Sequence, residues 1–222
     1  MAFETGVSVS EGGRGGAGKH APPSVRALLR KSTAPPHERM HAHPGFHAAA
    51  AGMIGDRDYR RLLSRLLGFH RPFEGLIRAA ARRHGVDLDF DARARSPLLV
   101  LDLMSLGLGR GDIEGLPDWA PSLDLPSEGA VLGSLYVLEG STLGGVQIGR
   151  SLKARFGDER DEGRRFFLGR GERHGALWGE FVTRLETLAE RPQSCDDAVA
   201  ASLATFTEFE RWMAGWAIEP TP

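Results

Sequence analysis

The residues best suited to metal chemistry lie in one short segment near the N-terminus. Of the eight histidines in this chain of 222 residues, His37 and His41 are four positions apart, a spacing that puts both imidazoles on one helix face. Such a pair suits a zinc ion, and Glu38-x-x-His41 matches half of a di-iron site. A di-iron site needs a second Glu-x-x-His, which the sequence lacks. His37 is therefore a candidate metal ligand whose partner the residues alone do not identify.

A second unusual segment, residues 132–145, has a helical pattern interrupted by glycines. Gly133, Gly140 and Gly144 follow the spacing i, i+7, i+11 and so share one helix face. A glycine inside a helix costs about 1 kcal/mol relative to alanine, so this face needs a compensating use. Either a neighbouring helix approaches closely, or a flat ligand lies against bare backbone and the helix bends as it enters. The spacing leaves both uses open.

The elements that must position these residues are helices. Apolar residues recur at steps of three and four, and strand-type alternation is nearly absent. The sequence therefore predicts an all-α fold, with one domain over residues 24–217 built by helix-on-helix packing. Pro72 is expected to kink or split a long helix, and the pair Pro35-Pro36 to restart the first helix at Pro35. The first predicted helix begins near residue 25 and meets Pro35-Pro36. The other predicted helices cover about residues 56–77, 92–106, 126–149, 172–190 and 196–216.

Composition narrows the class of protein. Lys plus Arg is 28 and Asp plus Glu is 29, which gives a net charge of −1 and disfavours nucleic acid or an anionic membrane as partner. No run of about 18 apolar residues is present, so no membrane span is expected. The single cysteine, Cys195, excludes an intramolecular disulfide and suits a cytoplasmic location. Residues 1–23 are rich in glycine and predict a disordered tail.

The two chemistry-bearing segments together resemble the haem oxygenase family, in its bacterial, biliverdin-producing and bacteriophytochrome-associated branch. Leu29-Arg30-x-x-Thr33-x-x-x-His37 resembles the family's proximal helix. Leu135-Tyr136-Val137-Leu138-Glu139-Gly140-Ser141-Thr142-Leu143-Gly144-Gly145 resembles its distal helix. The resemblance extends over about residues 24–217 and implies a helical bundle that holds haem between these two helices.

On the proximal side, the resemblance implies three roles. His37 would be the neutral imidazole ligand of the haem iron, Arg30 would pair with a haem propionate, and Phe206 would line the pocket wall. Haem is flat and apolar with an anionic edge, so it requires an apolar slot with cations at the mouth. A single imidazole also leaves the sixth iron position free for oxygen.

On the distal side, the resemblance assigns Gly140 and Gly144 to the backbone that lies over the haem face. Ser141 stands where much of the family has an aspartate in its proton relay. The identity of that relay is therefore open: Ser141 could hold a water, and an arginine, Tyr136 or Glu139 could complete the network.

The reaction implied by the resemblance is oxygen-dependent opening of haem to biliverdin, carbon monoxide and ferrous iron, with haem as both cofactor and substrate. Electrons would come from an external reductase or ferredoxin, because no Gly-x-Gly-x-x-Gly follows a strand. The biliverdin would serve a bacteriophytochrome or the iron would be used, and the sequence does not indicate which meso carbon is cut. Two other hypotheses remain: a haem-binding or trafficking module without ring opening, suggested by Ser141, and a catalytically silent helical domain.

Overall fold

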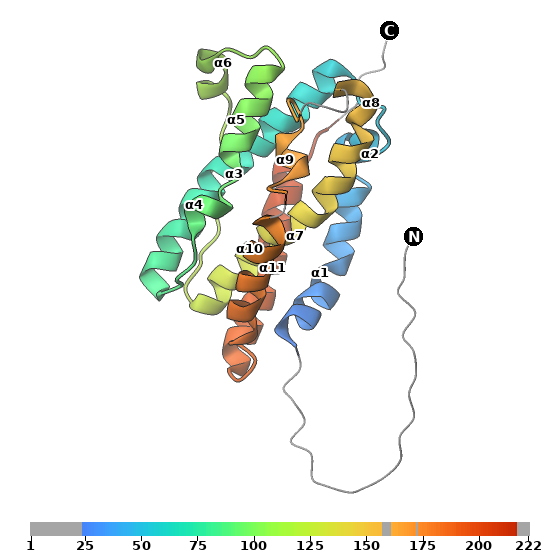
Figure 1. The fold of residues 1–222 in the computed structure, drawn as a ribbon. Coiled ribbons are helices and arrows are strands. Elements are labelled where there is room, and N and C mark those ends of the chain that lie inside the picture. Colours follow the sequence, from blue (N-terminus) through green and yellow to red (C-terminus); the bar gives the residue numbers. More distant parts are fainter. Residues whose placement is uncertain (1–23, 157–160, 172, 217–222) are drawn as a thin grey trace, which may run out of the picture.

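The computed structural model describes residues 24–156, 161–171 and 173–216. These residues form eleven helices and no strand, which confirms the predicted all-α fold (Figure 1). The predicted tail, residues 1–23, lies outside the described residues. Over those residues, no helix has the length and apolar character needed to cross a membrane. In chain order the helices are α1 (Val25–His41), α2 (Pro44–Ala50), α3 (Asp56–His84), α4 (Phe90–Arg93), α5 (Ser96–Ser105), α6 (Arg110–Glu114), α7 (Glu128–Ser151), α8 (Lys153–Phe156), α9 (Arg165–Leu168), α10 (Arg173–Glu186) and α11 (Pro192–Met213).

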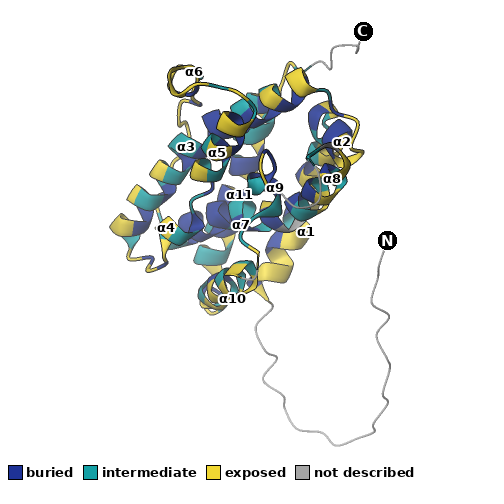
Figure 2. Cartoon of the chain, turned by 45° about the horizontal axis from the view of Figure 1, so that its top comes forward, coloured by how far each residue is buried: buried dark blue, intermediate teal, exposed yellow. Residues whose placement is uncertain are grey.

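Helix α7 is the central element of the bundle. It packs along α11 in the most extensive helix pair of the described chain, and it also contacts α3 and α9. Helix α1 packs on α11 as well, whereas α1 and α7 make little direct contact with each other in the part that the structure describes. The helices turn their buried faces inward, as Figure 2 shows in dark blue. A space therefore remains between α1 and α7.

The first helix does not restart at Pro35. Helix α1 runs without a break from Val25 to His41 with both prolines inside it, so that expectation was wrong. The two missing N–H groups leave the carbonyls four residues earlier, at Lys31 and Ser32, without helical partners. Lys31 is exposed and Ser32 half-buried, so water can bond these carbonyls, and burial of Pro36 holds the segment in place.

Pro72 does not split its helix either, because α3 continues for 29 residues from Asp56 to His84. The carbonyl that Pro72 leaves free belongs to Gly68, and it accepts a 2.8 Å hydrogen bond from the backbone N–H of Trp119. A side chain at Gly68 would prevent this crossing, since its Cβ would lie 2.2 Å from the carbonyl oxygen of Pro117. A tertiary hydrogen bond thus replaces the missing helical one.

The segment predicted as one helix from residue 92 to 106 is two helices, α4 and α5, separated at Ala94 and Arg95. Pro97 lies in the first turn of α5, where its missing N–H is tolerated. The Glu74 carboxylate of α3 accepts hydrogen bonds from the N–H groups of Arg95 and Ser96, which fixes the break. The short helices α2, α6, α8 and α9 were not predicted.

Candidate functional site

A cavity of about 590 Å³ occupies the space between α1 and α7. This volume lies within the range of pockets that hold cofactors and other small molecules. Aromatic side chains from α3, α9 and α11 line the rest of it. The structure brings all six residues singled out in the sequence to this cavity, and they are Arg30, His37, Gly140, Ser141, Gly144 and Phe206.

The α1 wall presents an imidazole. His37 lies on the cavity-lining face of α1, and within the described residues neither of its ring nitrogens makes a hydrogen bond. Desolvation and then the neighbouring His41 lower the pKa of His37, so the ring is neutral at pH 7 and able to bind a metal. The two rings are T-shaped with centroids 4.5 Å apart. Among the described residues no group of three or more His, Cys, Asp or Glu side chains is arranged to hold a metal ion.

Cations line the cavity near the start of α1. Arg26 and Arg30 come from its first two turns, and neither forms a salt bridge within the described chain. The Arg26 guanidinium lies 5.8 Å from the ring centroid of Trp178, which with Tyr136 adds aromatic surface at this place. An anionic group that enters here would find two arginines that form no salt bridge within the described chain, with Glu186 as the neighbouring carboxylate at the Arg26 backbone N–H.

The α7 wall is made partly of bare backbone. A Cβ atom added to Gly140 or Gly144 would meet nothing within 4 Å, and both residues line the cavity. Gly133 differs, because its added Cβ would lie 2.1 Å from the Ala198 carbonyl oxygen on α11. The structure therefore shows close helix packing at the start of α7 and an open cavity wall further along.

A buried arginine that sequence reasoning missed holds the glycine stretch. Arg95 donates a 2.8 Å hydrogen bond to the Ser141 hydroxyl and another of 2.8 Å to the carbonyl oxygen of Phe166. Its guanidinium also lies 4.0 Å from the centroid of the Phe166 ring. Burial lowers the pKa of Arg95 to about 10, so it remains charged at neutral pH. The Ser141 hydroxyl in turn donates to the Leu138 carbonyl oxygen at 2.7 Å.

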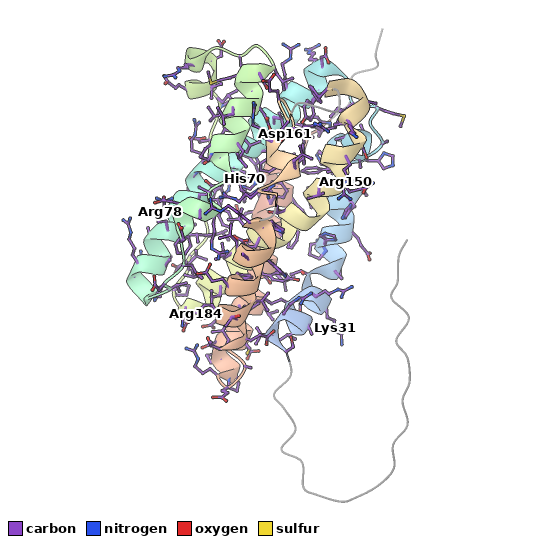
Figure 3. All side chains as sticks on the ribbon, in the orientation of Figure 1. Lys31, His70, Arg78, Arg150, Asp161 and Arg184 are labelled. Carbon is purple, nitrogen blue, oxygen red and sulfur yellow. The ribbon has the colours of Figure 1, made fainter. Side chains whose placement is uncertain are left out.

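The structure also places a buried histidine at the cavity. His70, near the centre of the molecule in Figure 3, lines the cavity from α3. Its Nδ1 lies 3.5 Å from Oε1 of Glu74, one turn further along α3. Burial lowers the pKa of His70, opposed by Glu74. Burial acts to raise the pKa of Glu74, but the hydrogen bonds that this carboxylate accepts outweigh burial and lower it. The i, i+4 spacing of the two residues was the available sequence signal.

The two other candidates for the distal network lie apart. Tyr136 lines the cavity, whereas Glu139 does not. Glu139 is on the far side of α7, where Oε1 lies 3.0 Å from an Arg93 nitrogen. Glu139 therefore has a structural partner behind the helix and no direct access to the cavity.

Comparisons with known proteins agree with this fold. Residues 121–215 match the family model described as heme oxygenase. The fold is similar to the NO- and CO-bound heme oxygenase of Neisseria meningitidis (TM-score 0.66, 18% identity, 86% of this chain and 90% of that one). It is also similar to heme oxygenase from Leptospira interrogans (TM-score 0.63, 16% identity, 87% of this chain and 100% of that one). A third similar structure is heme oxygenase-1 of Synechocystis sp. PCC6803 in complex with heme (TM-score 0.58, 14% identity, 85% of this chain and 91% of that one). A search of curated proteins by sequence gives no match.

Proposed function

We propose that this chain is a member of the haem oxygenase family that binds haem between α1 and α7 and opens its ring with O2 and externally supplied electrons. The products would be biliverdin, carbon monoxide and ferrous iron. The observation that carries the proposal is the pairing of a neutral, unbonded imidazole at His37 with the bare backbone of Gly140 and Gly144 on the facing helix, across a cavity of about 590 Å³.

The cavity residues fit haem in shape and in charge. The aromatic and aliphatic lining matches a flat apolar ring, and Arg30 and Arg26 are free to pair with its two carboxylates. His37 would hold the iron from the α1 side. Phe206 would line the wall from α11. When bound, haem supplies the iron that activates oxygen and also the carbon bridge that is cut.

The distal residues have separable tasks. Gly140 and Gly144 admit a flat ring close to the backbone, which a side chain at either position would prevent. The Ser141 hydroxyl already donates to Leu138 and accepts from Arg95, so its task is to hold the helix turn. Among the titratable side chains that line the cavity, His70 on α3 is the one backed by Glu74. His70 is therefore our candidate for holding and passing a proton on this side.

The hydrogen bonds of Ser141 also support a second candidate function. Ser141 replaces an acidic residue and its proton is engaged, so a haem-binding or trafficking module without ring opening is the alternative. The two functions differ in one result, the fate of the haem ring when electrons and oxygen are supplied.

The decisive experiment uses the full chain with haemin. We expect a Soret band typical of a histidine-ligated haem, its loss in His37→Ala, and its recovery when imidazole is added to that variant. His41→Ala is the matched control and should keep the wild-type band. With a reductase system in air, the wild type should yield a bilin, and chromatography of the product identifies the meso carbon that is cut. Intact haem after reduction would favour the binding module, and normal ligation in His37→Ala would remove His37 from its assigned role.

The wider setting belongs to the same proposal. We place the protein in a bacterial cytoplasm, with a reductase or ferredoxin as electron donor and with a bacteriophytochrome as one receiver of biliverdin. These assignments rest on the sequence motifs and on the lack of a nucleotide-binding fingerprint in the sequence. Reconstitution with candidate donors, scored by the rate of bilin formation, tests the donor directly.

A further inference from the structure

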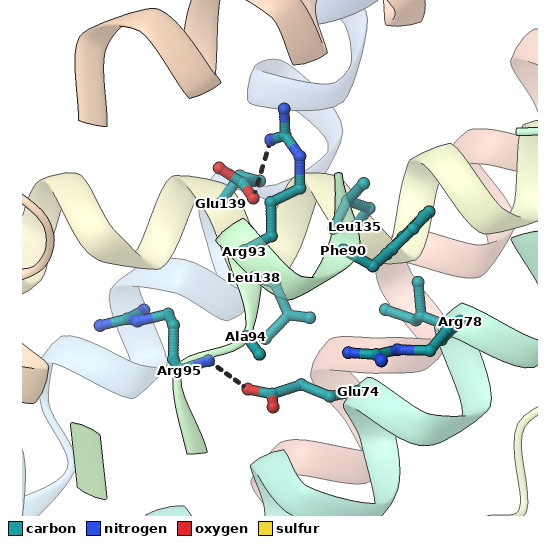
Figure 4. A pocket seen from close by; sticks show the side chains of 10 residues that line it. Glu74, Arg78, Phe90, Arg93, Ala94, Arg95, Leu135, Leu138 and Glu139 are labelled. Carbon is teal, nitrogen blue, oxygen red and sulfur yellow. Dashed lines mark hydrogen bonds and ion pairs between the residues drawn. The ribbon is translucent and has the colours of Figure 1, made fainter. Parts of the chain in front are cut away.

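Two arginines of one tripeptide contact the distal helix α7, one at Glu139 and one at Ser141. The last residue of α4 and the connection to α5 read Arg93-Ala94-Arg95 and lie against α7, as Figure 4 shows. An Arg93 nitrogen lies 3.0 Å from Glu139 Oε1, and Arg95 donates to the Ser141 hydroxyl at 2.8 Å. The two residues that flank Gly140 are thus each held by one arginine, Glu139 on the side of α7 away from the cavity and Ser141 at the cavity wall.

The tripeptide is itself anchored to three other elements. Arg93 donates to Glu180 Oε2 at 2.6 Å and to the Leu177 carbonyl oxygen at 3.0 Å, both on α10. Arg95 reaches α9 through the Phe166 carbonyl oxygen. Glu74 of α3 accepts the N–H of Arg95. The tripeptide therefore links α3, α9 and α10 to a single turn of α7 and fixes that turn relative to these helices.

The arginine grip matters because Gly140 cannot hold its own position. It has no side chain, and the space where a Cβ would lie is open. Its position therefore depends on the residues that flank it, Glu139 and Ser141. The Arg93 and Glu139 side chains are only 2% and 9% exposed, and a buried pair is weakly screened by salt and solvent.

We propose that Arg93 is a positioning residue, which acts through Glu139 to set how closely the backbone at Gly140 approaches the cavity. In the bound protein this would fix the distance between the distal backbone and the haem face. That last step rests on the proposed function, whereas the grip on α7 does not.

Amide hydrogen exchange of the apoprotein tests the grip without any haem. We expect residues 137–145 to exchange about tenfold faster in Arg93→Met and in Glu139→Gln than in the wild type. Arg93→Lys, which keeps the charge, should restore part of the protection. The matched control is Arg78→Met, which removes the 2.7 Å pair between Arg78 and the exposed Asp91 near the same connection but leaves the Arg93–Glu139 ion pair and the Arg95–Ser141 hydrogen bond in place. It should leave exchange at 137–145 unchanged.

Four results separate the outcomes. Unchanged exchange at 137–145 in folded Arg93→Met, or in Glu139→Gln if Arg93→Met does not fold, would overturn the proposal. An equal rise along α11 would also overturn it, because it would mean general destabilisation. With haem bound, we expect Arg93→Met to broaden the distribution of bilin isomers while the Soret band of the His37-ligated haem persists. If no variant and no wild type forms bilin, the proposed function fails, but the exchange result still decides the role of Arg93.

Discussion

Replacing either of two glycines on α7 by alanine should change stability in opposite directions. At Gly140 the new methyl group would enter open space, whereas at Gly133 it would lie 2.1 Å from the Ala198 carbonyl oxygen. Ordinary van der Waals contact begins at 3.4 Å, so the Gly133 variant is 1.3 Å too close to main-chain atoms. The residue type, the helix and the substitution are the same, so the two variants differ mainly in what lies beside each glycine.

The magnitudes follow from helix propensity and packing. Alanine is favoured over glycine inside a helix by about 1 kcal/mol, so Gly140→Ala should stabilise the apoprotein by about that amount. Gly133→Ala gains the same helix-propensity free energy but forces α7 and α11 apart. Overpacking against backbone costs about 1–3 kcal/mol or more. A net loss of about 2 kcal/mol is expected because Ala198 cannot move without its helix.

Thermal unfolding of the apoproteins measures both effects. For a chain of this size 1 kcal/mol corresponds to about 2–4 °C in Tm, so Gly140→Ala should melt a few degrees higher and Gly133→Ala several degrees lower than the wild type. Haemin titration should show the opposite ranking for haem affinity, with weaker binding in Gly140→Ala and nearly normal binding in folded Gly133→Ala. A fall in Tm for Gly140→Ala would refute the reasoning, because it would mean that this face of the helix is already occupied.

Three further predictions concern other parts of the chain. Gly68→Ala should lower the free energy of unfolding by about 3 kcal/mol, since the crossing loop leaves no room for a methyl group. Gly75→Ala on the same helix meets open space and should raise the free energy of unfolding by about 1 kcal/mol. Urea titration measures both changes. Burial acts to raise the pKa of Glu186, but hydrogen bonds from the first turn of α1 outweigh burial and lower the pKa. The Glu186 carboxylate therefore stabilises the fold at pH values above its unfolded pKa. This stabilisation is lost as the pH falls through the pKa of the folded protein. Glu186→Gln should therefore cost about 1 kcal/mol at pH 7 and nothing once the wild-type carboxyl is protonated, as unfolding at a series of pH values would reveal. Finally, desolvation and then His41 lower the pKa of His37, so His41→Ala should raise that pKa in an NMR titration of the apoprotein, and an unchanged value would show that the two rings do not interact.

The sequence predicted the long helices well because their apolar spacing is local. The start of α7 near Ser127 and most of α3 follow from residues that are neighbours along one helix face. The errors have tertiary causes. Pro72 is tolerated because Trp119, 47 positions further on, bonds the freed carbonyl, and no local pattern contains that information. The break before α5 likewise depends on Glu74, a residue of another helix.

The candidate site divides in the same way. His37 and the glycine stretch were found because each forms a compact motif, and the structure places both at one cavity. Arg95 was missed because its segment reads only as part of an apolar helix, and it gains meaning through Ser141 and Phe166. Glu139 was one of the alternatives that the sequence left open for the distal network, and the structure places it away from the cavity, since position in a motif does not show which side of the helix a side chain occupies.

The two groups of glycines on α7 explain why a helix with so poor a propensity is stable. At Gly133 the missing side chain lets α11 approach to backbone contact, so the cost of glycine is offset by close packing along the most extensive helix pair. At Gly140 and Gly144 no protein contact offsets that cost, and the buried ion pair and hydrogen bond from Arg93 and Arg95 hold the helix there instead. A stretch of helix that is kept smooth on one face and braced on the other has the form expected where a ligand, and not another helix, completes the packing.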